Sequence, residues 1–160
     1  MLKKNIKPAD KSLTPEHWTK VLAAAESEMK GLVLMAITTG QRIGDIIVLT
    51  HGDVDMRNGT IFFHLPKTRR VLEVPLDLGV RMWLEQQPQS IIPIEPATPL
   101  FPQLAARGAA KAALYLRKLG QKVGVDLASV SFRHTFVHRL MEQGTPREVI
   151  RRRLGYRSRR

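Results

Sequence analysis

The chain has 160 residues, of which 43% are hydrophobic, and this fits one folded domain with a core rather than a disordered chain. Its 26 lysines and arginines outnumber its 14 acidic residues and give a formal net charge of +12, which is typical of proteins that bind nucleic acid. The absence of cysteine excludes disulfides, thiolate catalysis and cysteine-ligated zinc, and we expect neither a metal nor a cofactor.

No apolar run approaches the roughly 20 residues that cross a bilayer, and the first residues lack the apolar centre of a signal peptide. We therefore expect no membrane partner and a cytoplasmic, nucleoid-associated protein. Residues 1–12 are expected to form a basic segment or linker ahead of one domain over residues 13–160. Residues 133–160 contain nine arginines and only two acidic residues, so a polyanion is the expected partner of this segment.

The first third of the chain is predicted to be helical. Thr14-Pro15-Glu16 combines a capping hydroxyl, a proline and an acidic residue, which predicts the start of a helix. Apolar residues at helical spacing predict that this helix extends to about Met29. A second, apolar helix is expected over residues 31–38. It ends in a break at Gly40, and a short helix begins at Arg42.

The middle of the chain changes to β-rich sequence. Residues 60–65 and 70–75 are short runs of β-branched and aromatic residues, which predict the two strands of an antiparallel hairpin. Pro66-Lys67-Thr68-Arg69 connects them, so Lys67 is predicted at or next to the hairpin tip.

Helices and one proline-rich connection are predicted for the remainder. An amphipathic helix is expected over residues 77–87, with Leu78, Met82 and Trp83 facing inward. A proline-rich connection follows over residues 88–102, and further helices are expected over residues 103–119, 133–143 and 146–154. These elements predict an α+β fold that is mainly α-helical, with a small antiparallel hairpin or three-stranded sheet on one side.

Three basic residues stand at the ends of these elements, namely Arg42 at a helix start, Lys67 at the hairpin tip and Arg133 opening a later helix. Two arginines that converge on a phosphodiester can donate paired N–H bonds to its oxygens, and a lysine can protonate a departing oxygen. Asp45 lies one helical turn beyond Arg42 and could pair with its guanidinium. The alternative for Arg42 is an ordinary surface ion pair.

The motifs around these residues resemble those of the tyrosine recombinases, the phage integrase family, in its catalytic domain. Thr39-Gly40-Gln41-Arg42-Ile43-Gly44-Asp45 is similar to the first arginine motif of that family, and Pro66-Lys67-Thr68 is similar to its hairpin lysine motif. Arg133-His134-Thr135-Phe136 is similar to its second arginine motif, and Leu154-Gly155 to the start of its Leu-Gly-His segment. The resemblance covers about residues 13–158, with the motifs in the family's order.

The resemblance implies a site-specific recombinase domain that integrates and recombines DNA without a metal or a nucleotide. In that family a tyrosine attacks the scissile phosphate, a 3′-phosphotyrosine conserves the bond energy, and a free 5′ hydroxyl reverses the step. Arg42 and Arg133 would hold the phosphate, and Lys67 would act as general acid. Asp45 would support Arg42. Double-stranded DNA would also contact Arg69, Arg70, Arg151, Arg152, Arg153 and Arg157.

The sequence departs from the family pattern at three places. In an ungapped match, Val130 stands where the family has the histidine of its His-x-x-Arg motif. Alternatively, Ser129-Val130-Ser131-Phe132 resembles the family segment just before that histidine, as if His-x-Leu were missing before Arg133, and in both cases the histidine is absent. His134 is expected to be structural and to point elsewhere, about 100° around the helix from Arg133. Tyr156 occupies the usual histidine or tryptophan position and could still donate a hydrogen bond to phosphate. The family's nucleophilic tyrosine would lie beyond Arg160.

These departures predict a domain that lacks the nucleophile segment and does not cleave DNA alone. Tyr115 is expected to pack within a helix, and Tyr156 as a displaced nucleophile is a weaker alternative. Without the segment that family members exchange, the chain is expected to be a monomer in free solution, although it could meet other recombinase subunits on DNA. Two other functions stay open, a non-catalytic DNA-binding remnant or regulator and a basic RNA-binding protein.

Overall fold

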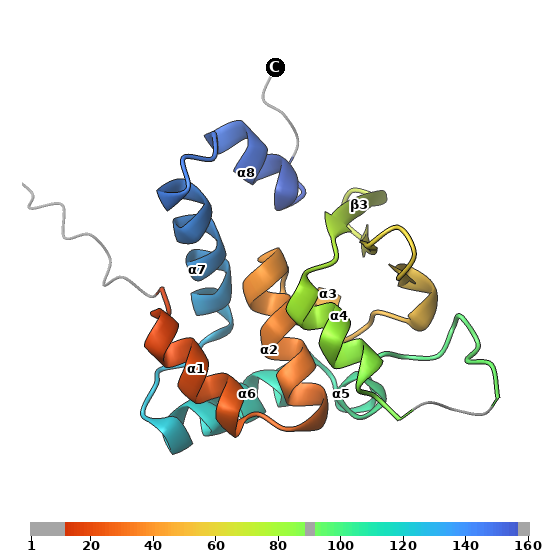
Figure 1. The fold of residues 1–160 in the computed structure, drawn as a ribbon, viewed down its shortest axis with the longest axis horizontal. Helices are drawn as coiled ribbons and strands as arrows, with labels where there is room; N and C mark the ends of the chain where they lie inside the picture. Colours follow the sequence, from red (N-terminus) through yellow and green to blue (C-terminus); the bar gives the residue numbers. More distant parts are fainter. Residues whose placement is uncertain (1–11, 89–91, 157–160) are drawn as a thin grey trace, which may run out of the picture.

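The computed structural model describes residues 12–88 and 92–156, which form helices and one small sheet (Figure 1). The helices are α1 (Pro15–Ala24), α2 (Ser27–Thr39), α3 (Ile43–Ile46), α4 (Leu78–Glu85), α5 (Pro102–Arg107), α6 (Ala109–Val123), α7 (Ser129–Glu142) and α8 (Arg147–Arg153), with a 3₁₀ turn η1 (His51–Asp53). The strands are β1 (Val54–Asp55), β2 (Thr60–Leu65) and β3 (Arg70–Pro75). The predicted fold, mainly helical with a small antiparallel sheet, is confirmed.

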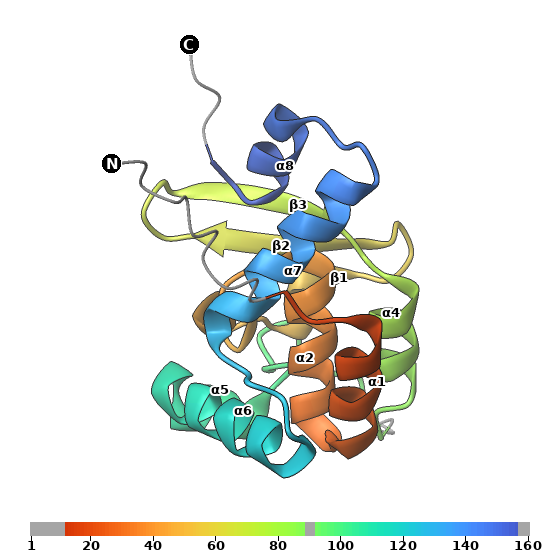
Figure 2. The same cartoon turned by 90° about the vertical axis from the view of Figure 1, so that its left-hand side faces the viewer.

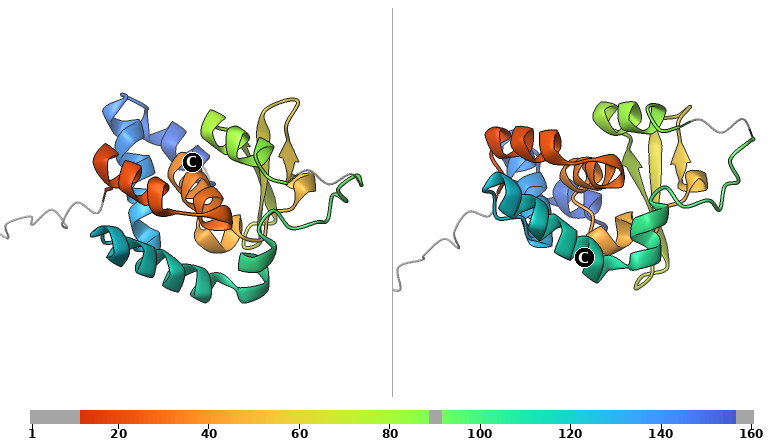
Figure 3. Two further views of the ribbon diagram at one scale, coloured as in Figure 1. Left: turned by 60° about the horizontal axis from the view of Figure 1, so that its bottom comes forward. Right: turned by 90° about the horizontal axis from the view of Figure 1, so that it is seen from below.

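Helix α2 runs through the centre of the molecule. Helices α1, α6 and α7 lie to one side of it, and the sheet and α4 lie to the other (Figures 1 and 3). Helix α8 turns back from the end of α7 toward the β2–β3 hairpin (Figure 2). The loop that follows α2 is therefore surrounded by elements from the end of the chain.

The three strands pair in the order β1-β2-β3, and both pairings are antiparallel. At the hairpin turn, Leu65 of β2 pairs with Arg70 of β3, which leaves residues 66–69 as the connection. Ile61 and Phe63 alternate toward the core and are at most 1% exposed. The sequence predicted this hairpin with the bounds that the structure has, and Lys67 lies at its tip.

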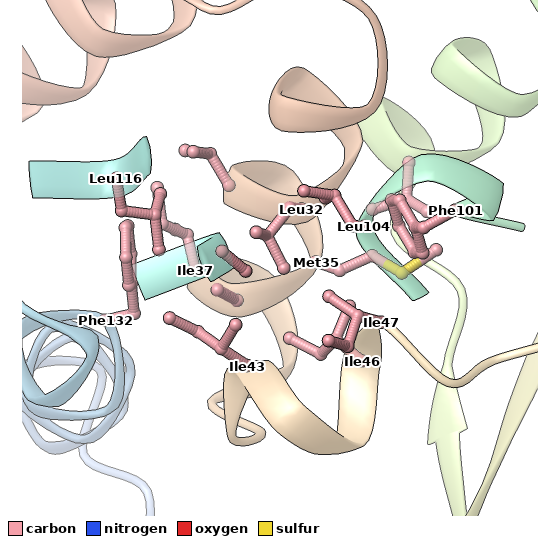
Figure 4. Packing of buried hydrophobic residues seen from close by; sticks show 14 of the residues in the cluster. Leu32, Met35, Ile37, Ile43, Ile46, Ile47, Phe101, Leu104, Leu116 and Phe132 are labelled. Carbon is pink, nitrogen blue, oxygen red and sulfur yellow. The ribbon is translucent and has the colours of Figure 1, made fainter. Parts of the chain in front are cut away.

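One hydrophobic core joins α2 to the elements around it (Figure 4). Leu32, Met35 and Ile37 of α2 are at most 1% exposed. Figure 4 shows them between Leu116 of α6 on one side and Leu104 of α5 on the other. Burying a side chain of this size stabilises the fold by about 1.5–3 kcal/mol, so the core fixes α2 and the start of the loop that follows it.

The bounds predicted for the first two helices are wrong. Helix α1 ends at Ala24 instead of continuing to about Met29, and α2 begins at Ser27, where the expected range began at residue 31. Ala25 and Glu26 have extended backbones, with ψ of 134° and 154°, and these two residues break the helical path between the helices. Apolar residues continue at helical spacing through both helices, so periodicity alone does not reveal the break.

Two later helix bounds also differ from the prediction. The helix expected over residues 103–119 is two helices, because Gly108, with a φ of 88°, separates α5 from α6, and α6 continues to Val123. Helix α7 begins at Ser129, so Arg133 lies one turn inside the helix instead of opening it. The Arg133 backbone is thereby held by a complete helical turn.

Helix α4 buries a different face from the one predicted. Leu78 and Met82 are 69% and 50% exposed, whereas Val80 and Trp83 are buried. The Trp83 ring stacks on Phe101, with ring centroids 5.3 Å apart, and this contact sets the rotation of the helix. Of the three inward-facing side chains predicted here, only Trp83 is correct.

Candidate phosphate-binding site

The loop over residues 39–42, between α2 and α3, is the centre of the candidate site. Gly40 ends α2 in the left-handed conformation, with φ 66° and ψ 7°. A Cβ at this position would lie 2.4 Å from Cδ1 of Phe136, so the loop backbone passes directly against α7. Arg42 then begins α3 as its N-cap residue, with an extended backbone and an exposed side chain.

Arg133 on α7 is bonded to this loop. Its Nε donates a hydrogen bond to the Gly40 carbonyl oxygen at 2.9 Å. The guanidinium has five N–H donors in a rigid fork, so this bond anchors one edge of the group and leaves the Nη groups for other acceptors. Arg133 is thus oriented in advance of any ligand.

Gln41 ties the same loop to α8. Its side chain is 3% exposed, and its Nε2 donates to the carbonyl oxygens of Arg153 at 3.1 Å and Thr39 at 3.3 Å. Gln41 was not predicted to be a site residue. The sequence places this polar amide in a short loop between two apolar helices, where it is expected to be buried. A buried amide needs hydrogen-bond partners, so the sequence could have indicated that Gln41 ties the loop to another element.

Arg42 and Arg133 line one cavity of about 600 Å³. The other walls come from α3, α6, α7 and the segment after α8. The lining residues are Gln41, Arg42, Ile43, Gly44, Ala109, Ala113, Arg133, His134, Val137, Leu154 and Tyr156. The structure therefore brings together three of the residues predicted for the site, Arg42, Arg133 and Tyr156, within largely apolar walls that strengthen electrostatic interactions.

Tyr156 lies beside the anchored arginine. Arg133 Nη1 donates a long hydrogen bond to the Tyr156 hydroxyl oxygen at 3.5 Å. The Arg151 guanidinium carbon lies 5.3 Å from the centroid of the Tyr156 ring, a cation–π contact. Tyr156 is 44% exposed and lines the cavity.

The ion pair considered for Arg42 and Asp45 is absent from the structure. Within the described residues, the ion pairs join His64 to Asp53 at 2.9 Å and His138 to Glu142 at 3.6 Å, and neither involves Arg42. The reason is that Arg42 precedes the helix with an extended backbone, φ −70° and ψ 144°, so the side-chain spacing of a helix interior does not apply. The guanidinium of Arg42 is left for a ligand.

His134 does not point away from the site as we expected. It is exposed and lines the same cavity as Arg133. Arg133, His134 and Val137 of α7 all line this cavity. The cavity therefore covers at least about 100° of the helix surface, and His134 lies in it although it points about 100° away from Arg133. His138, one turn further, has the spacing of a metal-ligand pair with His134, but no three such side chains gather as metal ligands within residues 12–88 and 92–156.

Lys67 does not line the cavity in this structure. It is exposed at the hairpin tip, two positions beyond Leu65. The hairpin meets the site at Leu65, because a Cβ on Gly155 would lie 2.7 Å from the Leu65 Cδ1 atom. The tip that carries Lys67 therefore lies near the segment that carries Tyr156.

The arginines predicted to contact DNA occupy the hairpin and α8. Arg69 and Arg70 are exposed in the hairpin, Arg152 and Arg153 are exposed on α8, and Arg151 is partly buried. Arg157 lies outside the described residues. In the part of the chain that the structure describes, no helix combines the length and the apolar character needed to cross a membrane.

Comparison with known proteins identifies the family. Residues 11–160 match the phage integrase family, so the chain belongs to this family, as its motifs predicted. The tyrosine recombinase XerA of Thermococcus kodakarensis is 27% identical over 155 residues, which cover 91% of this chain and 54% of that protein. The chain thus spans about half the length of this relative.

Solved structures share the fold at lower sequence identity. The crystal structure of XerA recombinase matches with a TM-score of 0.73 and 19% identity, over 92% of this chain and 55% of that one. The Tn1549 transposon integrase in complex with transposon right end DNA matches with a TM-score of 0.71 and 20% identity, over 92% and 58% of the two chains. These likenesses agree with the fold predicted from the sequence.

Proposed function

We propose that this chain is the DNA-binding catalytic domain of a site-specific tyrosine recombinase, a class of protein that breaks and rejoins DNA strands through a 3′-phosphotyrosine, and that it does not cleave DNA alone. The observation that carries the proposal is that Arg42 and Arg133 line the same cavity of about 600 Å³. The match to the phage integrase family and the likeness to a tyrosine recombinase support it.

Arg42 and Arg133 would bind the scissile phosphate together. In the transition state, phosphorus has five oxygen neighbours, and its non-bridging oxygens carry more negative charge than those of the ground-state diester. Positively charged groups held in place beside these oxygens therefore stabilise the transition state. Arg133 is anchored on Gly40, and Arg42 makes no ion pair within the described residues. Neither guanidinium would have to leave an acidic partner to bind phosphate.

Lys67 would supply a proton to the departing oxygen. As the oxygen of the family's nucleophilic tyrosine, which gives up its proton to solvent, bonds to phosphorus, the bond from phosphorus to the 5′ oxygen breaks, and that oxygen takes a proton from the lysine ammonium. A small displacement of the hairpin tip would carry Lys67 toward the cavity, because Leu65 of the same hairpin already lies against Gly155. Tyr156 would donate its hydroxyl proton to a non-bridging oxygen.

Double-stranded DNA is the proposed partner. The net charge of +12 and the exposed arginines Arg69, Arg70, Arg152 and Arg153, on the elements beside the cavity, suit a phosphate backbone. We propose that the protein acts on nucleoid DNA in the cytoplasm. The same positive charge would keep free chains apart as monomers until DNA brings recombinase subunits together.

A second candidate function is a non-catalytic DNA-binding remnant or regulator. Val130 favours it, because valine cannot exchange a proton at the position of the family histidine. The two candidates bind DNA through the same residues and differ in strand cleavage.

Duplex binding tests what the two candidates share. The affinity for a labelled duplex should fall steeply as salt rises, because bound phosphates release counterions. Binding that does not respond to salt, or a preference for structured RNA in competition, would contradict both candidates.

A nicked suicide duplex separates the two candidates by trapping covalent adducts, and the protein is extended past Arg160 for this test, because the chain that ends there is expected not to cleave alone. An adduct of the extended protein that is lost in Arg133→Ala supports the catalytic domain. Salt-dependent binding by the extended protein without an adduct supports the remnant. An adduct that persists in Arg133→Ala and is lost in Tyr156→Phe would contradict the proposed roles of both residues.

A further inference from the structure

One side of helix α6 faces the phosphate-binding cavity. Ala109 and Ala113 line it, whereas Ala112 and Leu116 are fully buried in the core. Each helical residue turns about 100° and rises about 1.5 Å, so positions four apart form a stripe along one side. The stripe that begins with Ala109 and Ala113 continues to Arg117.

Arg117 is an exposed cation at the end of this stripe. Within the described residues it makes no hydrogen bond, ion pair or cation–π contact. The other cations of α6 are Lys111, Lys118 and Lys122. They lie about 140–180° around the helix from Ala113, whereas Arg117 lies about 40° from it. Arg117 is thus the one cation of α6 on the cavity side.

We propose that Arg117 binds a backbone phosphate of the duplex beyond the phosphate held in the cavity, so that the DNA-binding surface extends along α6. The inference rests on the proposed function, because it takes duplex DNA as the ligand of the cavity. None of the described residues that line the cavity is acidic, so the approach of a second phosphate along this side meets no negative side chain there.

The spacing along the helix suits a DNA strand. The backbone at Arg117 lies about 6 Å beyond Ala113 and about 12 Å beyond Ala109 along the helix axis. The phosphates of one strand follow one another about every 3.4 Å along the duplex axis. A strand of a duplex whose axis lies parallel to α6 would pass about two to four phosphates between the cavity and Arg117.

The test compares Arg117→Ala with Lys111→Ala. Each variant removes one positive charge from the net +12, and alanine is a strong helix former, so α6 should stay folded in both. Lys111 lies at the level of Ala109 and Ala113 but on the opposite side of the helix. The measurement is fluorescence anisotropy of one labelled duplex at a series of salt concentrations.

We expect Arg117→Ala to weaken binding and to reduce the slope of log affinity against log salt by about 1, the loss of one phosphate contact. Lys111→Ala should leave this slope unchanged. Arg117→Lys keeps the positive charge and should retain most of the wild-type slope. Equal effects of the two alanine variants, or an unchanged slope in Arg117→Ala, would overturn the inference.

The variant Arg42→Ala separates this inference from the proposed function. If Arg42→Ala weakens salt-dependent binding and Arg117→Ala does not, only the inference about α6 fails. If the wild-type chain shows no salt-dependent duplex binding, or Arg42→Ala binds as the wild type does, the proposed function fails.

Discussion

Arg133 on α7 donates a 2.9 Å hydrogen bond to the carbonyl oxygen of Gly40, and this bond joins the two arginine motifs of the chain. Gly40 is two residues before Arg42. The position of the Arg42 guanidinium relative to that of Arg133 therefore depends on this hydrogen bond. The Phe136 ring closes the same junction, because it lies too near Gly40 for any side chain there. A single loop thus sets the geometry of the candidate phosphate site.

Replacing Arg133 by lysine should damage the fold or DNA binding. Lysine keeps the charge, but its single ammonium cannot donate to Gly40 and also face the cavity. We expect duplex affinity to fall where the ammonium bonds Gly40, and the free energy of unfolding to fall by up to about 1.5–3 kcal/mol, the range for hydrogen bonds of charged groups, where it faces the cavity instead. Urea unfolding and anisotropy measure the two effects.

Arg139→Lys is the control on the same helix. The Arg139 guanidinium stacks on Trp18, 5.2 Å from its ring centroid, and does not line the cavity. This variant should bind duplex as the wild type does. A stable, fully binding Arg133→Lys variant would contradict the anchoring role of the Gly40 bond.

Gly40→Ala should destabilise the protein far more than Gly144→Ala. Both glycines have positive φ, 66° and 77°, so each substitution carries the left-handed backbone cost of about 1–2 kcal/mol. A Cβ at Gly40 also meets Phe136 at 2.4 Å, whereas nothing lies within 4 Å of a Cβ at Gly144. Overpacking should add about 1–3 kcal/mol at Gly40 alone, and equal urea midpoints would show that the loop is not packed against α7.

Gln41→Leu should loosen α8 from the loop. The substitution leaves the Arg153 carbonyl without its 3.1 Å donor, at a cost of about 1–3 kcal/mol. Hydrogen exchange should quicken at the amides of Leu154 and Tyr156, which close the end of α8. Gln143→Leu, an exposed glutamine after α7, is the control, and matching exchange rates in the two variants would refute the link.

Tyr156→Phe should lower duplex affinity without changing stability. The hydroxyl is proposed as a phosphate ligand, and losing one neutral hydrogen bond of about 0.5–1.5 kcal/mol corresponds to roughly a two- to tenfold weaker complex. Tyr115→Phe is the matched control, because the Tyr115 hydroxyl accepts a hydrogen bond from Arg107 and does not line the cavity. Equal affinities of the two variants would remove Tyr156 from the proposed site.

The hairpin was predictable because local signals determine it, whereas the convergence of the arginines was expected from the family resemblance. Turn residues between two β-rich runs fix the strands over Thr60–Leu65 and Arg70–Pro75. Motif order, read through the family resemblance, led us to expect that Arg42 and Arg133 meet, although neither packing nor distance is visible in the sequence.

The errors arise where tertiary contacts override local patterns. Leu78 and Met82 fit an inward stripe, but the stacking of Trp83 on Phe101 turns α4 so that both are exposed. The Arg42–Asp45 pair failed because the backbone at Arg42 is extended, which residue spacing does not reveal. His134 lies in the cavity because the cavity is wide, and its width depends on α6, a distant part of the chain.

The central claim is that Arg42 and Arg133 hold one phosphate together, and a double-mutant cycle on duplex binding tests it most directly. Arg42→Ala, Arg133→Ala and the double variant would be compared with the wild type in one buffer, after confirming that each is folded. Residues that share one partner are coupled, so we expect the double variant to lose clearly less affinity than the sum of the single losses. Losses that add within about 0.3–0.5 kcal/mol would show that the arginines act on separate phosphates and would contradict this claim.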